Sequence, residues 1–305
     1  MPVPHASGNF GDLLDPRFQR IRDEEYKRLP DKLPDIYAFV PSNGRNNMQW
    51  SGVGTLPDFS QWGGNVTYES QSQGYDTTLT YLAFVNGLQI ERDLYEDDQY
   101  HVMDQKPRAL AASAYRTRQK HGALIFNNMS TVDNFFANNT EGVALVSNSH
   151  TTTSGASTAT GFDNLTTAAM SAVTVTASRI QMRGFRGDQA ERISVMPDEL
   201  WYPTELCEVA YEIIAASGKV DTALNNPNYH QGKYKGHEWE FLTSTRNWAM
   251  VDGTMRRMSL NWVDRIPLEY AMIEDFESMA AKWRAYMRYG AAWTDWRWIC
   301  GAVVA

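Results

Sequence analysis

The chain has 305 residues, of which 43% are hydrophobic and 21% are charged, close to the average of globular proteins. These fractions argue against a disordered or fibrous chain, and the length suggests two lobes or one elaborated domain. The 28 Lys and Arg against 36 Asp and Glu give a formal net charge of −8, unlike the clustered basic charge of duplex-binding proteins. No stretch reaches the roughly 20 apolar residues of a membrane span, and no signal peptide begins the chain. Because Cys207 and Cys300 are the only cysteines, a disulfide framework is excluded, and we expect a soluble protein made in a cytoplasm.

The first sixty residues do not have the pattern of a compact domain. Asp15 and Pro16 predict the start of a mostly charged helix, since Asp caps helices and Pro fits their first turn. Prolines and glycines interrupt any regular element from residue 30 to 57. A disordered tail is one interpretation, but interleaved apolar residues favour an extended arm with a docking surface. These residues are Ile36, Tyr37, Phe39, Val40, Met48 and Trp50.

Residues 65–85 predict a long β-hairpin. Val66 and Tyr68 alternate with polar neighbours, residues 77–85 are rich in β-formers, and a polar turn around Gly74 lies between them. A two-stranded ribbon is marginally stable alone in water. We therefore expect this hairpin to lean on its own chain or on a neighbouring one.

The middle of the chain alternates between helical and extended patterns. Asp104 and Pro107 predict the start of one long helix that runs to about Met129, with a bend near Gly122 left open. A strand is predicted at residues 141–146, followed by a loop-like Ser/Thr/Gly/Ala tract at 147–161. An amphipathic helix is predicted at 165–183, with its apolar side formed by Leu165, Ala169, Val173, Ala177 and Ile180.

The last hundred residues mix one further helix with aromatic strands. A strand at 200–203 is stopped by Pro203, and a helix at 206–217 is ended by Gly218. Strands are predicted around Trp239 and Phe241, around Trp248 and Met250, and at 258–262 and 293–304. Residues 274–289 fit either a helix or a strand.

The residues with catalytic potential do not form a recognisable site. His230 and His237 lack the spacing of a common zinc motif and are interpreted as exposed loop histidines. No phosphate loop and no nucleophile elbow is present in the sequence. Asp97, Asp98 and Glu240 could serve as the paired carboxylates of a glycosidase, but carboxylates are abundant in an acidic chain. We therefore expect no enzyme, no cofactor and no metal.

Three segments carry a resemblance to a known family. Residues 141–150 (E-G-V-A-L-V-S-N-S-H), residues 197–203 (P-D-E-L-W-Y-P) and residues 289–297 (Y-G-A-A-W-T-D-W-R) are similar to short motifs of Mu-like phage coat proteins. Together with the order of arm, hairpin, long helix, mixed region and closing strand, they resemble the major capsid protein of tailed bacteriophages. The resemblance implies an α+β fold of the Hong Kong 97 type.

The resemblance also implies a layout and a function. Residues 1–62 would be the N-terminal arm, 63–92 the extended E-loop, 93–159 with 267–305 the peripheral P-domain around a spine helix, and 160–266 the axial A-domain. The chain would assemble as pentamers and hexamers in an icosahedral shell around packaged double-stranded DNA, forming a virion capsid built in the host cytoplasm. Apolar side chains of arm and hairpin would be buried on adjacent subunits. Expected subunit contacts are Arg17, Phe18, Arg22, Tyr68, Tyr75 and Arg92.

The implied partners are copies of the chain itself, separate scaffolding, portal and decoration proteins, and DNA in weak non-specific contact; no membrane is involved. Some relatives join subunits by an isopeptide bond from a hairpin lysine, but residues 60–90 contain no Lys, so we expect no such cross-link. We also expect no fused scaffolding segment, because the arm follows Met1 almost directly. The alternatives are an encapsulin-type nanocompartment shell and a carbohydrate-acting hydrolase.

Overall fold

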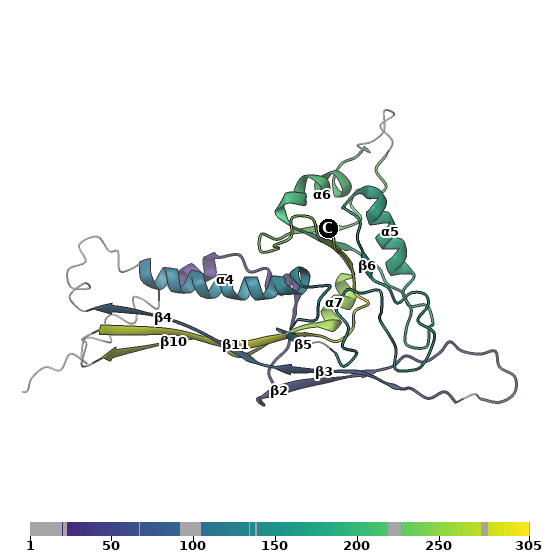
Figure 1. Ribbon diagram of the computed structural model, residues 1–305, viewed down its shortest axis with the longest axis horizontal. Helices are drawn as coiled ribbons and strands as arrows, with labels where there is room; N and C mark the ends of the chain where they lie inside the picture. The colour runs from purple at the N-terminus through teal and green to yellow at the C-terminus, as the bar shows by residue number, and fades with distance from the viewer. Residues whose placement is uncertain are drawn as a thin grey trace, which may run out of the picture. The chain divides into compact units, whose positions relative to one another are not determined.

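The computed structural model describes residues 20, 23–66, 68–91, 105–133, 135–137, 139–218, 227–275 and 280–304 (Figure 1). The chain divides into two compact units. The first comprises residues 1–33, 81–121 and 264–289, and the second comprises 34–80, 122–263 and 290–305. No helix in the described ranges is both long and apolar enough to cross a membrane.

In the first unit a long helix packs on antiparallel strands. Its elements are β4 (Leu82–Glu91), most of α4 (Gln105–Asn127) and the adjoining parts of β10 (Leu260–Asp275) and β11 (Ala280–Trp293). Strand β11 pairs with β4 along its length, down to Tyr289 opposite Leu82. Figure 1 shows α4 running along these strands, and the Phe84 ring on β4 lies 4.6 Å from that of His121 on α4. The predicted long helix is confirmed, and the described residues of the ambiguous segment 274–289, namely 274–275 and 280–289, form strand.

Residues 30 and 31, near the end of the segment 1–33, pack against α4. The Tyr115 hydroxyl donates to the carbonyl of Pro30 at 2.6 Å, and Gln119 Nε2 donates to Asp31 Oδ1 at 2.6 Å. Arg118 on the same helix is buried and pairs with Asp264 Oδ2 at 3.1 Å. Burial alone would lower the pKa of Arg118, but the nearby Asp264 outweighs this and raises it, so the guanidinium remains charged.

A mixed five-stranded sheet forms the core of the second unit. In spatial order its strands are β6 (Leu165–Thr166), β12 (Ile299–Ala302), β9 (Trp248–Val251), β7 (Glu199–Tyr202) and β8 (Lys235–Glu238). Strand β12 is parallel to β6, β9 is antiparallel to both of its neighbours, and β8 is parallel to β7. Every residue of β7, β9 and β12 is buried, as expected of strands covered on both faces.

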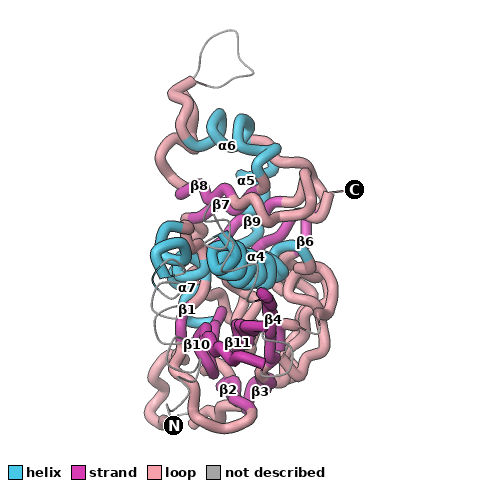
Figure 2. Tube along the Cα trace, turned by 90° about the vertical axis from the view of Figure 1, so that its left-hand side faces the viewer, coloured by secondary structure: helices cyan, strands magenta, loops and turns pink. Residues whose placement is uncertain are grey.

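Three helices accompany this sheet. They are α5 (Ala172–Arg183), α6 (Cys207–Ile214), which follows the 3₁₀ turn η3 (Thr204–Leu206), and α7 (Gly253–Ser259). Figure 2 shows α6 above β7 and β8. Asp252 caps α7 by accepting from the amides of Thr254 and Met255 at 2.9 and 3.0 Å.

The prediction for α5 was wrong in two respects. The helix begins after Ser171, whose side chain forms a capping box with Thr174, so residues 165–166 are free to form strand β6. In addition, the expected apolar stripe faces solvent, since Val173 and Ile180 are 78% and 68% exposed. The buried side carries Val175, Ser178 and Met182 instead.

The remaining strands are short pairings and one two-stranded ribbon. Strand β1 (Ala38–Phe39) follows the short helix α2 (Leu33–Ile36) and runs parallel to the start of β10, and β5 (Phe136–Ala137) runs parallel to the end of β11. The ribbon consists of β2 (Asn47–Val53) and β3 (Gln73–Thr80) in antiparallel register. The predicted pairing of a strand at Val66 and Tyr68 with residues 77–85 was therefore wrong, because β3 pairs with the earlier segment and β4 joins a different sheet.

Of the other predictions of local structure, some were wrong and some are confirmed. Residues 141–146 are not a strand: Gly142 is in a turn with φ of 72°, and the Val146 amide donates to the carbonyl of Met129. Trp239 and Phe241 lie after β8 rather than in a strand, and residues 253–259 form α7, so Met258 is helical. The predicted strand at 200–203 is confirmed, and the helix after it ends three residues earlier than expected.

Candidate assembly surface

The ribbon tip, residues 54–72 between β2 and β3, exposes an unusual concentration of large apolar side chains. Phe59 and Tyr68 are 106% and 90% exposed. The other exposed members are Leu56, Trp62 and Val66. Fully burying one such side chain is worth roughly 1.5–3 kcal/mol. Exposed apolar groups gathered in one segment mark a surface for another molecule.

Glycines let the two strands of the ribbon approach closely at its base. A Cβ on Gly52 would lie 2.6 Å from the carbonyl oxygen of Tyr75, nearer than real Cβ atoms come. The amide of Gly54 donates to the carbonyl of Ser72 at 2.9 Å and closes the base of the tip. The base is thus held in one geometry by backbone contacts.

Side chains of two loops fix the ribbon to the second unit. The Tyr75 hydroxyl lies 2.6 Å from Thr151 Oγ1, and Thr153 Oγ1 donates to the carbonyl of Gln73 at 2.7 Å. Just after β2, at the start of the tip, Thr55 Oγ1 accepts from the amide of Asp188 at 3.0 Å. The ribbon therefore leaves the unit from a fixed base, with its apolar tip beyond these contacts.

A polar groove of about 320 Å³ lies beside the ribbon base, between it and the segment after β11. Arg297 lies between two carboxylates, with Nη2 at 2.9 Å from Asp188 Oδ1 and Nη1 at 3.1 Å from Asp295 Oδ1. Burial would lower the pKa of Arg297, but the two carboxylates outweigh it and raise the pKa. The guanidinium also donates to the carbonyl of Arg186 at 2.7 Å. This cluster therefore connects the loop at residues 186–188 to the segment after β11.

The beginning of the second unit is better buried than the sequence suggested. Ile36 and Tyr37 are 0% and 3% exposed, the Tyr37 hydroxyl donates to the carbonyl of Gly122 at 2.7 Å, and its ring packs edge-on against Trp262. The expectation that the docking residues of the arm lack partners in their own chain is corrected for these two. Phe39, by contrast, is 45% exposed.

The two histidines considered for chemistry have packing roles. His230 is 4% exposed and its Nε2 lies 3.0 Å from Thr176 Oγ1. His237 lies on β8 and stacks on Trp201 with ring centroids 4.2 Å apart. Their interpretation as exposed loop residues was wrong, because His230 is buried and His237 is half-buried on a strand. Within the described ranges, no group of three or more His, Cys, Asp or Glu side chains could hold a metal ion.

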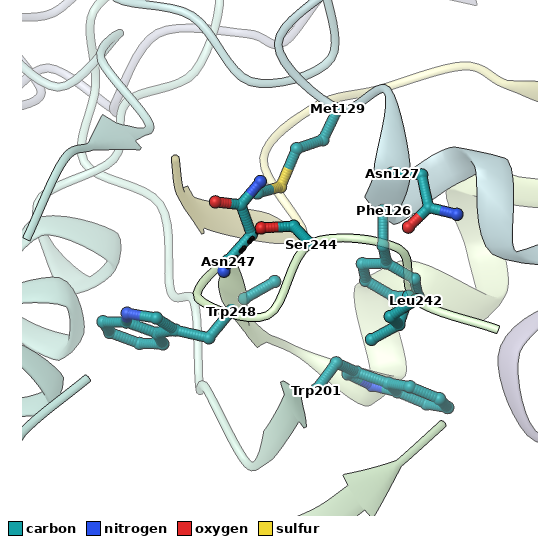
Figure 3. A pocket seen from close by; sticks show the side chains of 9 residues that line it. Phe126, Asn127, Met129, Trp201, Leu242, Ser244, Asn247 and Trp248 are labelled. Carbon is teal, nitrogen blue, oxygen red and sulfur yellow. Dashed lines mark hydrogen bonds between the residues drawn. The ribbon is translucent and has the colours of Figure 1, made fainter. Parts of the chain in front are cut away.

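A small cavity beneath the mixed sheet is too small for a ligand. Phe126, Trp201 and Trp248 are among its lining residues, and Asn247 donates its amide to Ser244 Oγ at 3.2 Å (Figure 3). Its volume is about 10 Å³. A single water molecule needs roughly 10–15 Å³ of such space, so this is a packing defect.

The structure brings together only part of the predicted contact set. Tyr68 is exposed on the ribbon tip, whereas Tyr75 is half-buried at the ribbon base against Thr151. Arg17, Phe18, Arg22 and Arg92 lie outside the described residues, as do Asp97 and Asp98. Phe59 and Trp62, the large exposed groups that sequence reasoning missed, could have been found as aromatics in a Pro- and Gly-bounded segment.

A ribbon with an exposed apolar tip, a long helix laid on extended strands and a separate mixed sheet define a structural subunit of the Hong Kong 97 capsid type. A family model described as phage capsid protein matches residues 82–302. The chain therefore belongs to the phage capsid protein family and is a structural capsid protein. This membership favours the capsid interpretation over the hydrolase considered above.

Solved structures support the same fold at low sequence identity. The asymmetric unit of the bacteriophage PhiM1 mature capsid aligns with a TM-score of 0.59 and 8% identity, covering 91% of this chain and 88% of that one. The bacteriophage JBD30 capsid aligns with a TM-score of 0.54 and 15% identity over 70% and 92% of the two chains. The capsid of a native GTA particle gives 0.55 and 11% over 89% of each. No curated protein matches the chain significantly in sequence.

Proposed function

We propose that the chain is the major shell subunit of a phage head, assembling as pentamers and hexamers into an icosahedral shell around packaged double-stranded DNA. The observation that carries this proposal is the exposed apolar ribbon tip. A monomer has no use for Phe59 and Trp62 in water, whereas an adjacent subunit could bury them. Obligate contacts of this kind commonly bury 2,000 Å² or more, so assembly would supply stability that the isolated chain lacks.

The family layout can be proposed with one change. We assign the extended loop to the β2–β3 ribbon and its tip, since these residues form the two-stranded element that the sequence placed at 63–92. The arm would then precede residue 47. The peripheral domain would contain α4 with β4, β10 and β11, and the axial domain would contain the mixed sheet with α5 and α6.

Subunit contacts are proposed at the ribbon tip and the arm. Tyr68 on the tip would join Phe59 and Trp62 against a neighbour, and Tyr75, half-buried at the ribbon base, would contribute less. Arg17, Phe18, Arg22 and Arg92 remain proposed contacts of arm and loop. Separate scaffolding, portal and decoration proteins, and assembly in the host cytoplasm, complete the proposal.

Assembly of purified protein tests this function. The double variant F59S/W62S removes two of the three exposed aromatics of the tip, and V132S/M196S removes two exposed apolar residues elsewhere as a control. We expect negative-stain microscopy to show polyhedral particles for the natural protein and the control. We expect the tip variant to stay as small oligomers with an unchanged circular dichroism spectrum. Particle formation by the tip variant at the natural yield would overturn the role of the tip, and failure of the natural protein to form shells would overturn the function.

A further inference from the structure

The two ends of residues 141–150, one of the three motif segments of the sequence, meet in a buried pair. His150 Nδ1 lies 3.2 Å from Glu141 Oε2, and the side chains of His150 and Glu141 are 0% and 1% exposed. The His150 ring also stacks on Trp296, with ring centroids 4.3 Å apart and an angle of 6° between the rings. Because Trp296 belongs to the motif segment 289–297, two segments far apart in the chain meet at this pair.

Both ring nitrogens of His150 face oxygen atoms that accept hydrogen bonds. Nδ1 faces the Glu141 carboxylate, and Nε2 lies 3.3 Å from the carbonyl oxygen of Leu145. Burial alone would raise the pKa of Glu141, but hydrogen bonds from His150 and Thr151 outweigh it and lower the pKa, so this carboxylate stays an acceptor. A neutral imidazole has one N–H, whereas the protonated ring has two. Only the protonated ring therefore satisfies both contacts.

The pair joins two stretches of chain that hold strand β3 of the ribbon. Just before it, the amide of Thr140 donates to the carbonyl of Asp76 at 2.8 Å. Just after it, Thr151 Oγ1 lies 2.6 Å from the Tyr75 hydroxyl. The amide of Thr151 also donates to Oε1 of Glu141. The ribbon strand is thus held from both ends of the segment that the pair closes.

Loss of the ring proton removes one of the two hydrogen bonds of His150. Whichever nitrogen keeps its hydrogen, the other then presents a lone pair to a buried oxygen. A buried carboxylate or carbonyl that has lost its donor destabilises the arrangement. The segment 141–150 is therefore favoured in its closed form while the ring is protonated, and it opens more readily once the proton is lost.

The other charged groups around the pair belong to neighbouring elements and have partners of their own. The Arg297 guanidinium lies 5.0 Å from the centroid of the Trp296 ring and is paired with Asp188 and Asp295. On β3, the Asp76 carboxylate accepts from the side chain of Gln73. Among the described residues, Glu141 is the one that forms an ion pair with His150.

We propose that Glu141 and His150 position the ribbon for contact with a second copy of the chain, and that they do so only while His150 is protonated. This inference rests on the proposed function, in which the ribbon tip meets an adjacent subunit. The pair acts through Thr151 and the backbone of β3 and touches no other subunit itself. The segment opens when Glu141 takes up a proton at low pH or when His150 loses its proton at high pH, so the ribbon is held between these two limits.

Hydrogen–deuterium exchange of the full-length, unassembled chain measures how firmly the ribbon is held. Mass spectrometry follows the peptides that contain residues 47–53 and 73–80 from pH 6 to 10, with each rate divided by the intrinsic rate at that pH. NMR of ¹⁵N-labelled histidine follows the His150 ring, whose signal is the one missing in H150Q. In the natural protein the ribbon should exchange at least about tenfold faster once His150 has lost its proton, with both changes at the same pH.

Two variants and one control separate positioning from packing. H150Q cannot carry the charge, so its ribbon should exchange at least about tenfold faster than the natural one at pH 6 and show no further step at higher pH. Y75F leaves the buried pair in place and removes the hydroxyl that meets Thr151, so its ribbon should exchange faster at pH 6 while His150 titrates unchanged. H237Q removes a histidine that stacks on Trp201 with nearly the same geometry, 4.2 Å and 6°. Its ribbon exchange should stay within about twofold of the natural value, because the site is independent.

Assembly of the same proteins connects the pair to the contact between subunits. Negative-stain microscopy at pH values on either side of the His150 change should show fewer shells of the natural protein at the higher pH. H150Q should form few shells at either pH, and H237Q should behave as the natural protein does. Failure of the natural protein to form shells at any pH would defeat the proposed function, and the exchange data would then decide by themselves whether the pair holds the ribbon.

Four outcomes would overturn the inference. In the first, His150 loses its proton without any change in ribbon exchange. In the second, H237Q loosens the ribbon as much as H150Q does, which would assign the effect to ring stacking alone. In the third, H150Q forms shells at the natural yield. In the fourth, Y75F leaves ribbon exchange unchanged, a result that counts even if circular dichroism shows that H150Q does not fold.

Discussion

Arg256 and Glu199 form a buried ion pair in which Nη2 of the arginine lies 2.9 Å from Oε1 of the glutamate and Nε lies 3.2 Å from Oε2. The indole of Trp201 donates to the same Oε2 at 3.0 Å, and Arg256 also donates through Nη1 to the carbonyl of Ile36. This one guanidinium therefore connects α7, strand β7 of the mixed sheet and the first residues of the second unit.

Removing the arginine of this pair should strongly destabilise the subunit. R256M leaves Glu199 buried without its partner, a change that typically costs about 3–5 kcal/mol. Urea denaturation of the unassembled chain measures the loss. The neighbouring R257Q, at an exposed position of the same helix, should change stability by less than about 0.5 kcal/mol. The double variant E199Q/R256M should recover part of the loss, and additive effects would contradict the pairing.

Glu141 should make the stability of the second unit depend on pH in the acidic range. Burial alone would raise the pKa of Glu141, but hydrogen bonds from His150 and from the amide and hydroxyl of Thr151 outweigh burial and lower it. Because the folded pKa is below the unfolded one, the stabilisation is present above about pH 4.3 and disappears as pH falls through the lower folded value.

The variant E141Q tests this dependence. The natural protein should be more stable than E141Q at pH 6–7, and the difference in free energy of unfolding should shrink as pH falls below about 4. E240Q changes an exposed carboxylate and should show no comparable convergence. A gap between E141Q and the natural protein that stays constant from pH 3 to 7 would contradict the assignment.

The two cysteines should react very differently with thiol reagents. Cys300 is 0% exposed on strand β12 of the mixed sheet, and burial raises its pKa to about 12, so little reactive thiolate is present near neutral pH. Cys207 is exposed at the start of α6. We expect Ellman's reagent to modify one thiol in the folded, unassembled chain and two in urea. In C207S, rapid modification of the folded chain would show that Cys300 is accessible.

Assembled particles should contain no covalent subunit cross-links. Neither the ribbon nor its tip contains a lysine from residue 47 to 80, so the ribbon cannot supply the amine of an isopeptide bond. Denaturing electrophoresis and mass spectrometry of particles should show the subunit only as a monomer, without covalently joined multiples. A ladder of covalent dimers and larger species, resistant to reductant, would contradict this prediction.

Local sequence signals were sufficient to predict elements whose first or last residue is set by neighbouring residues in the chain. The span of α4 follows from Pro107 in its first turn and from the many Ala, Leu, Arg, Lys and Gln residues after it. Strand β7 ends before Pro203, because proline has no backbone N–H to donate to a neighbouring strand. The order of such elements, together with short motifs, was enough to indicate the capsid family.

Which strands pair and which side of a helix is buried could be determined only from the folded chain. The sequence could not show that residues 47–53, rather than 66–68, lie against β3, because alternating patterns define a strand but not its partner. It also placed the apolar side of α5 toward the core, although Val173 and Ile180 are exposed and Ser178 is buried.

The sequence by itself thus determined the fold class, the family and the position of the long helix, because propensity, capping and proline act between residues close in the chain. Only the tertiary structure decided that His230 is buried, that His237 stacks on Trp201, and that Arg256 meets Glu199. Those properties depend on groups that are far apart in the sequence, and burial energy acts on the folded surface rather than on local sequence.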